Sequence, residues 1–173
     1  MFGLFETLDM LGKAAALCLS IGAATDLPPE RAQVACAVAP TVVLEAQRRD
    51  LPPARLAALI WTESRYKPRA KSRAGACGLT QVIPRWSLDR STGRRWTCAE
   101  LMDPHESVRV GARLLRQITD RYARGDDRVG LCYYNAGNAC LRNRSWARGM
   151  SYVRKVLQVQ GRIERANPTG WPL

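Results

Sequence analysis

Apolar residues recur at spacings of three and four along most of this chain, which is the pattern of helices that bury one face. Several of these stretches open on residues that favour helix starts: Pro53, Asp103-Pro104 and Asp126-Asp127. Proline, glycine or asparagine follows the ends of several of these stretches. The pattern predicts helices over residues 29–50, 53–67, 103–122, 127–134 and 152–163.

The segment between the second and third of these helices follows a different pattern. Residues 70–84 contain three breaks, Gly75, Gly78 and Pro84, and the sequence is β-like from Leu79 to Ile83. Residues 85–102 are polar, which is typical of a loop with a short helix. We therefore expect a mainly helical domain, with a small β hairpin or irregular element inserted after its second helix.

The N-terminal segment, residues 1–36, has two interpretations. Residues 14–24 resemble the apolar part of a signal peptide. The segment before them should then be positively charged, but it has two acidic residues and only one basic residue, Lys13. The alternative is an amphipathic helix that docks on a partner. The longest apolar stretch, residues 14–24, already contains Ser20 and is shorter than the ~20 residues that span a bilayer, so no transmembrane helix is expected. Residues 37–166 would form the globular domain and 167–173 a tail.

Composition and charge narrow the classes of function. The chain has 173 residues, the size of one domain, and a net charge of +12. The first 36 residues carry a balance of −2, so the rest carries +14. This bias indicates affinity for a polyanion: nucleic acid, an anionic membrane surface or an acidic cell wall. The sequence contains no zinc finger, RNA-binding aromatic cluster or phosphate-binding glycine loop.

Histidine and cysteine usage limits the chemistry further. The single histidine, His105, lies where a helix is expected to begin, which favours an exposed first-turn residue over a catalytic one. A zinc hydrolase would need more ligands than one histidine, and no C-x-x-C pair is present. The six cysteines would form three disulfides in an oxidising compartment, with fifteen pairings open.

Glu63 is the residue best placed for catalysis. It follows an apolar run that ends in Trp61 and precedes chain-breaking sequence, so its carboxyl group would lie at the floor of an apolar cleft. Desolvation there raises the pKa of a carboxyl group, as a general acid near neutral pH requires. A glutamate at a helix end is more often simply solvated, so this position alone is weak evidence.

Four separate segments follow one another in an informative order. The sequence around Glu63 reads IWTESRY, and residues 72–84 fit the pattern S-x-x-G-A-x-G-L-x-Q-x-x-P. Asp103-Pro104 with its helix is the third segment, and Tyr134–Gly137 with Tyr152–Val156 is the fourth. Together these segments resemble the soluble lytic transglycosylases, a lysozyme-like family that cleaves peptidoglycan and has a helix ending in Glu-Ser. The resemblance spans residues 37–158 and implies a lysozyme-like fold of the α+β class.

The resemblance also implies roles for individual residues. Glu63 would cleave the MurNAc-β-1,4-GlcNAc bond as general acid and then base, without metal or cofactor, leaving 1,6-anhydroMurNAc ends. The implied substrate-binding residues are Ser64, Ser72, Gly78, Gln81, Tyr134, Asn135 and Tyr152. Cys77, inside the glycine motif, suggests a nearby disulfide. Residues 145–150 lack the second glutamate that several members carry, so any role of that carboxylate is in doubt.

Other assignments stay open at this level. Trp86, Trp96 and Tyr66 could stack on sugars, although such side chains more often serve packing. One rival function is a hydrolytic lysozyme with Asp89, Asp103 or Asp120 as second carboxylate. The other is a basic helical module that binds nucleic acid, although the preferred interpretation expects none. The partner would be peptidoglycan strands in the periplasm or cell envelope, or at a phage virion, with residues 1–36 docking to a virion or secretion complex.

Overall fold

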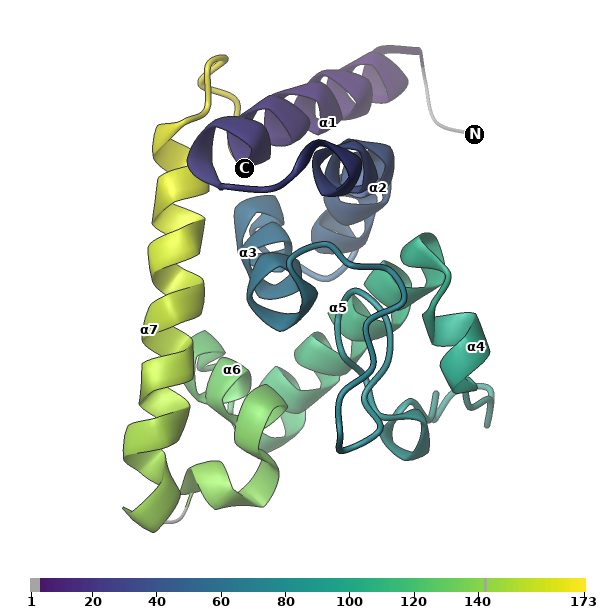
Figure 1. Ribbon diagram of the computed structural model, residues 1–173, viewed down its shortest axis with the longest axis vertical. Coiled ribbons are helices and arrows are strands. Elements are labelled where there is room, and N and C mark those ends of the chain that lie inside the picture. The colour runs from purple at the N-terminus through teal and green to yellow at the C-terminus, as the bar shows by residue number, and fades with distance from the viewer. Residues whose placement is uncertain (1–3, 142) are drawn as a thin grey trace.

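A computed structural model describes residues 4–141 and 143–173 of the protein, and these residues are mainly helical (Figure 1). The predicted helices are confirmed, although the last one begins nine residues earlier than its apolar pattern. Cap residues explain several starts, because Asp103 and Asp126 accept backbone N–H bonds in the first turns of their helices. The α-helices are α1 (Leu4–Ala24), α2 (Pro29–Gln47), α3 (Pro53–Ser64), α4 (Cys98–Leu101), α5 (Pro104–Tyr122), α6 (Asp127–Ala136) and α7 (Asn143–Arg165), with 3-10 turns η1 (Pro84–Trp86) and η2 (Gly137–Leu141).

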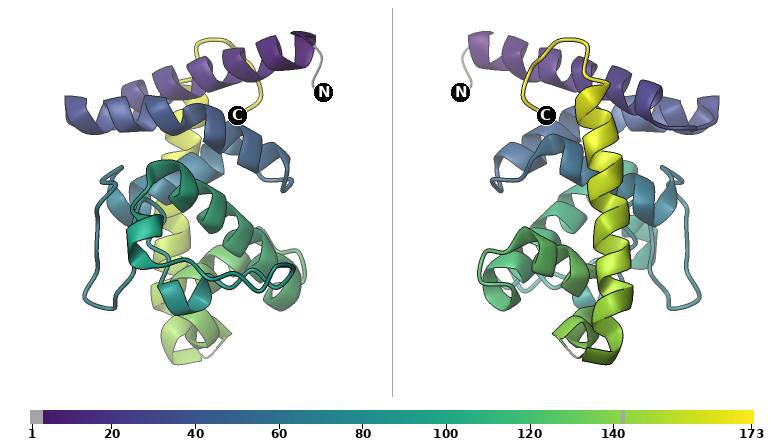
Figure 2. Two further views of the ribbon diagram at one scale, coloured as in Figure 1. Left: turned by 90° about the vertical axis from the view of Figure 1, so that its right-hand side faces the viewer. Right: turned by 90° about the vertical axis from the view of Figure 1, so that its left-hand side faces the viewer.

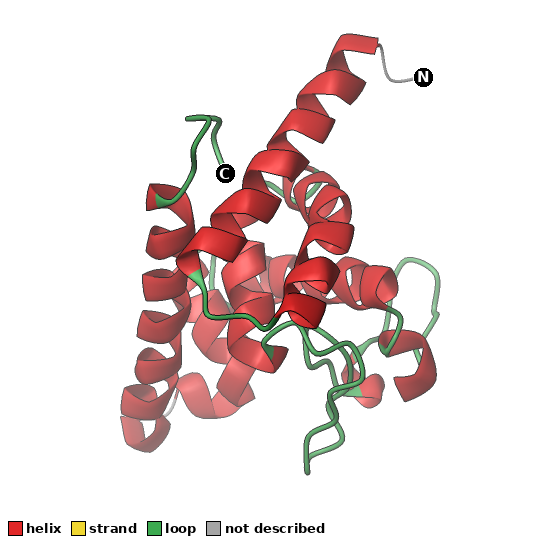
Figure 3. Cartoon of the chain, turned by 45° about the horizontal axis from the view of Figure 1, so that its top comes forward, coloured by secondary structure: helices red, strands yellow, loops and turns green. Residues whose placement is uncertain are grey.

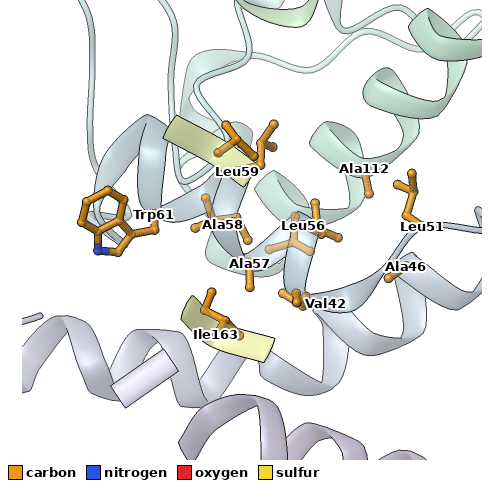
Figure 4. Packing of buried hydrophobic residues seen from close by; sticks show 14 of the residues in the cluster. Val42, Ala46, Leu51, Leu56, Ala57, Ala58, Leu59, Trp61, Ala112 and Ile163 are labelled. Atoms are coloured by element: carbon orange, nitrogen blue, oxygen red, sulfur yellow. The ribbon is translucent and has the colours of Figure 1, made fainter. Parts of the chain in front are cut away.

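Helix α3 lies at the centre of the molecule, with α1, α2, α5 and α7 around it (Figure 1). Every residue from Leu56 to Trp61 is buried, so this helix is apolar on all sides, as a central helix must be. Figure 4 shows its side chains packed near Val42 of α2, Ala112 of α5 and Ile163 of α7. This packing fixes the position of the C-terminal end of α3, which carries Glu63.

The chain between α3 and α4 is an irregular loop (green in Figure 3). Helix α3 ends where Arg65 and Tyr66 adopt positive φ angles of 49° and 57°. The β-like sequence forms only two isolated bridges, from Cys77 to Lys71 and to Val82, and no strand occurs among residues 4–141 and 143–173. The irregular alternative of the prediction is therefore the observed one. A disulfide between Cys77 and Cys98 ties this loop to α4, which confirms the disulfide expected at Cys77.

Helix α1 packs on α2 and on α7, which runs along one side of the molecule (Figure 2). Leu17 and Ile21 of α1 are buried in the main core, and a disulfide joins Cys18 to Cys36. The third disulfide, Cys132–Cys140, joins α6 to η2. Helix α2 runs across the predicted boundary at residue 36, so the structure contains no break there.

The N-terminal helix also corrects one expectation. By length and composition alone, residues 6–24 form a helix long and apolar enough to cross a membrane. The prediction considered only the uninterrupted apolar stretch 14–24, whereas the helix also includes Leu8 and Leu11 and few charges. Signal sequences and core helices meet the same criterion. Leu8, Leu11 and Leu19 are more than half exposed, so α1 has an uncovered apolar face.

Candidate active site

Glu63 lies in the last turn of α3 and is held by α7. The hydroxyl of Tyr152 donates a hydrogen bond to its Oε1 at 2.5 Å. Burial raises the pKa of Glu63 from 4.5 to about 7, although the Tyr152 hydrogen bond and the charge of Lys155 oppose the shift. A carboxyl group with this pKa is partly protonated at neutral pH, and can both donate and accept a proton there.

Two half-buried tyrosines lie near this carboxyl group. Burial, and then the charge of Glu63, raise the pKa of the Tyr152 hydroxyl far above its usual value, so it remains a neutral donor. The hydroxyl of Tyr134, on α6, donates to the carbonyl oxygen of Thr80 at 2.8 Å. Burial raises the pKa of Tyr134 as well, and the charge of Glu63 adds to the shift. Tyr152, in the middle of α7, thus contacts Glu63 at the end of α3, and Tyr134, near the end of α6, binds the loop at Thr80.

The glycine motif, residues 72–84, makes contacts that stabilise the conformation of its own loop. Gln81 has a positive φ of 51°, and its side-chain Nε2 donates to the carbonyl oxygens of Ala70 and Gly78 at 3.1 and 2.9 Å. Both amide hydrogens thus stabilise the loop, and its amide oxygen remains as an acceptor. Gly78 also has a positive φ, and a Cβ there would lie 1.8 Å from the carbonyl oxygen of Leu101. The absence of a side chain at Gly78 therefore permits the close approach of α4.

The other predicted binding residues lie in more local arrangements. The Ser64 hydroxyl donates to the carbonyl oxygen of Ile60 at 3.2 Å. The Ser72 hydroxyl accepts the N–H of Ala76 at 3.1 Å within the loop. Asn135 is exposed, and its side chain makes no hydrogen bond within the described ranges 4–141 and 143–173. The structure thus gathers Tyr134 and Tyr152 around Glu63 and gives Ser64 and Ser72 bonds to nearby backbone.

The three aromatic residues that could stack on sugars differ in how exposed their side chains are. Tyr66 is fully buried and its hydroxyl donates to the carbonyl oxygen of Ala57, which makes it a core residue. Trp96 is also buried, and its indole N–H donates to Glu106. Trp86 differs from both, because 59% of its surface is exposed, and the Arg85 guanidinium lies over its ring at 5.1 Å from the centroid. His105 lies in the first turn of α5 as predicted, but it is half-buried rather than exposed because its Nδ1 hydrogen-bonds the Thr41 hydroxyl at 2.7 Å.

The three aspartates of the lysozyme alternative all have structural partners. Asp89 pairs with Arg113 at 2.6 Å and accepts bonds from Ser91, which lower its pKa. Asp103 caps α5, and Asp120 pairs with Arg116 on the surface of the same helix. The charged side chain that does act on Glu63 is Lys155. Sequence analysis missed it, although its place three residues after Tyr152 puts both on one helical face.

Two solved structures share this fold. One is an inactive mutant of the lytic transglycosylase Slt from Pseudomonas aeruginosa, with a TM-score of 0.64 and 24% identity, covering 76% of this chain and 24% of that one. The other is the 70 kDa soluble lytic transglycosylase of Escherichia coli, with a TM-score of 0.64 and 17% identity, covering 90% of this chain and 30% of that one. At these identities the likeness concerns the fold.

Sequence comparison identifies relatives and a family. The chain is 32% identical to a protein named transglycosylase of Enterobacteria phage PRD1 over 119 residues, 68% of this chain and 41% of that protein. It is 33% identical over 87 residues, 47% of its length, to the membrane-bound lytic murein transglycosylase F of Pseudoalteromonas translucida, covering 17% of that protein. It thus spans less than half the length of either relative. The model of the transglycosylase SLT domain matches residues 42–152, so this chain belongs to the transglycosylase SLT domain family.

Proposed function

We propose that this protein is a peptidoglycan lytic transglycosylase that cleaves the MurNAc-β-1,4-GlcNAc bond, with Glu63 as its only catalytic carboxyl group. The observation that carries the proposal is the carboxyl group of the half-buried Glu63, with a pKa of about 7 and a hydrogen bond from Tyr152. Family membership supports the choice of substrate.

The proposed reaction uses this one group twice. Protonated Glu63 donates its proton to the glycosidic oxygen as the bond to the anomeric carbon breaks, and the GlcNAc-terminated part leaves as an alcohol. The resulting carboxylate then accepts the proton of the MurNAc 6-hydroxyl, whose oxygen forms the new bond to the anomeric carbon. The product has a 1,6-anhydro ring, and Glu63 ends protonated as it began. A pKa near neutrality suits both proton transfers.

Hydrolysis on the same fold is the weaker alternative. An inverting or retaining hydrolase holds a second carboxylate across the bond, to activate water or to act as nucleophile. Asp89, Asp103 and Asp120 are instead bound to an arginine or a helix N-terminus. The half-buried Tyr134 and Tyr152 carry hydroxyls that remain neutral beside the charge of Glu63, which suits an attack by a hydroxyl of the substrate.

The test is the Glu63→Gln variant on purified sacculi. Glutamine keeps the size of the side chain but cannot donate a proton to the glycosidic oxygen, so release of soluble muropeptides should fall at least 100-fold. Glu164→Gln is the matched control, because Glu164 is an exposed carboxylate on α7, and it should keep full activity. Full activity of the Glu63 variant would remove the proposed mechanism.

We also propose that the protein works in the bacterial envelope or a phage virion, with residues 1–36 docking on a partner there. The exposed apolar face of α1 supports such docking. The phage and membrane-bound relatives support the location. Mass spectrometry of the N-terminus of the protein from its native source tests the idea, because loss of residues 1–24 would remove the docking helix.

A further inference from the structure

A glycine packed against a disulfide lies about one helical turn before Tyr152. Gly149 of α7 is buried, and a Cβ at this position would clash with the Sγ of Cys132 on α6. Cys132 is bonded to Cys140 of η2, and both cysteines are fully buried. Helix α7 packs on α6 and on η2 (Figure 1). The backbone of α7 can therefore contact the disulfide because residue 149 has no side chain.

Helix α6 is also packed closely on its other side. Gly130 of α6 lies against Thr119 of α5, where a Cβ would clash with the threonine hydroxyl. Leu131 and Cys132 are fully buried, so this part of α6 is enclosed between α5 and α7. Interiors packed this closely transmit strain from one element to the next. The disulfide is therefore a rigid surface on which α7 rests.

This contact is close to the residue that touches Glu63. Residues three positions apart are neighbours on one face of a helix, and Gly149 and Tyr152 are about 4.5 Å apart along the axis of α7. The residues of α7 that are buried in the apolar core follow Tyr152 in the sequence: Val153, Val156, Val159 and Ile163. Gly149 thus holds α7 on the other side of Tyr152.

We propose that Gly149 is a positioning residue, because its contact with the Cys132–Cys140 disulfide sets the distance between the Tyr152 hydroxyl and Glu63. This hydrogen bond is 2.5 Å long. Hydrogen bonds between oxygen atoms need about 2.5–3.0 Å, so a displacement of α7 by about 1 Å would break it. The effect on catalysis rests on the proposed function, whereas the effect on the geometry does not.

The pKa of Glu63 reports the position of α7. Tyr152 and Lys155 of α7 both favour its carboxylate form, so a displacement of α7 away from Glu63 should raise this pKa. The charge of Glu63 also acts on Tyr134, but Tyr134 lies on α6 and its hydroxyl is bound to Thr80, so it should stay in place. Measuring this pKa requires no turnover.

The first test is NMR titration of protein labelled with ¹³C at the glutamate carboxyl groups, with the Glu63 signal assigned by its loss in Glu63→Gln. Gly149→Ala should raise the pKa of Glu63 by about 1, because the tyrosine bond to a charged group is lost. Gly161→Ala is the matched control on α7, since a Cβ there meets the flexible end of Arg165 at 3.2 Å, and it should leave the pKa unchanged. In the Tyr152→Phe protein, Gly149→Ala should cause no further rise. An unchanged pKa in Gly149→Ala, or an undiminished rise in the Tyr152→Phe protein, would overturn the proposal.

A second set of variants decides the question even if Gly149→Ala alone does not fold. Replacing both Cys132 and Cys140 by alanine leaves a gap opposite Gly149, and should also raise the pKa of Glu63. Adding Gly149→Ala fills this gap, because its Cβ would lie 3.6 Å from the Cβ at position 132, and should return the pKa toward the wild-type value. Replacing Cys18 and Cys36 by serine removes a disulfide elsewhere, and should leave the pKa unchanged. If adding Gly149→Ala has no effect or raises the pKa further, the proposal is wrong.

Turnover then connects this contact to catalysis. On purified sacculi, the pH at which kcat/KM falls should move upward in Gly149→Ala by as much as the pKa of Glu63, and kcat should change more than KM. If the pKa rises but this pH does not, Glu63 is not the acid, and the proposed function fails while the role of Gly149 stands. If the wild-type protein cleaves no sacculi, the proposed function fails as well, and the NMR titration still decides whether Gly149 positions Tyr152.

Discussion

Replacement of Tyr152 by phenylalanine should move the pH dependence of catalysis in a defined direction. The hydroxyl of Tyr152 donates to Glu63 Oε1 at 2.5 Å, and this bond stabilises the carboxylate form. Desolvation raises the pKa of Glu63 to about 7, and the Tyr152 bond is the larger of the two effects that oppose it. Without the bond, the pKa should rise further, because burial remains and the carboxylate loses its donor.

The size of the expected pKa change follows from the free energy that such a hydrogen bond contributes. A hydrogen bond to a charged group contributes about 1.5–3 kcal/mol, which corresponds to a pKa change of about 1–2. Activity requires protonated Glu63 in the free enzyme, so kcat/KM falls as pH rises through its pKa. The midpoint of this fall in kcat/KM should lie near pH 7 in the wild type, and about 1–2 pH units higher in Tyr152→Phe.

The assay is the pH profile of kcat/KM for the release of soluble muropeptides. Tyr133→Phe is the control, because the Tyr133 hydroxyl bonds Asn138 and its ring stacks on Tyr122, and its profile should match the wild type. A limb that stays in place or moves to lower pH in Tyr152→Phe would refute the assignment of the titrating group to Glu63.

Three further changes should alter stability in ways that chemical denaturation can measure. Glu63 binds its proton more tightly in the folded than in the unfolded state, so the free energy of unfolding falls as pH rises from 4.5 to about 7. Glu63→Gln should therefore be more stable than the wild type by about 3 kcal/mol at pH 8 but not at pH 4. Equal stabilities at pH 8 would count against the raised pKa. Gly78→Ala should lower the free energy of unfolding by about 2–4 kcal/mol, because residue 78 has a positive φ and the new methyl group would meet the Leu101 carbonyl. Gly75→Ala, also at a positive φ but with open space around it, should lower it by about 1 kcal/mol. Equal losses would show that crowding is not the cause. Replacing both Cys18 and Cys36 by serine should lower the free energy of unfolding by about 3 kcal/mol for a loop of 18 residues, and no loss would mean that the bond does not form.

Helix positions could be predicted from the sequence because their signals are local. Proline at the start of α3 and aspartate caps on α5 and α6 mark helix starts whatever surrounds them, and the structure confirms them. The loop after α3 depends on tertiary contacts. Leu79–Ile83 has β-like residues, but a strand needs a partner, and the Cys77–Cys98 disulfide holds this segment against α4 instead.

The site was predictable only in part, for a similar reason. Glu63 and Tyr152 followed from motif positions, and the hydrogen bond between them agrees with that choice. The positive φ of Gln81 and the crowding at Gly78 arise from tertiary packing, which no spacing in the sequence reveals. Lys155 acts on Glu63 from 92 positions along the chain, so only the folded structure brings the two charges together.

We propose that a hydroxyl of the substrate, rather than water, attacks the anomeric carbon. Intramolecular attack by a well-oriented group can be worth roughly 7–11 kcal/mol over an external nucleophile, so water should compete poorly. Digestion of sacculi in ¹⁸O-labelled water, followed by mass spectrometry of the muropeptides, identifies the attacking oxygen. We expect anhydro-muramyl ends that carry no label. Labelled oxygen on most new muramyl ends would show that the protein is a hydrolase and would contradict the proposed mechanism.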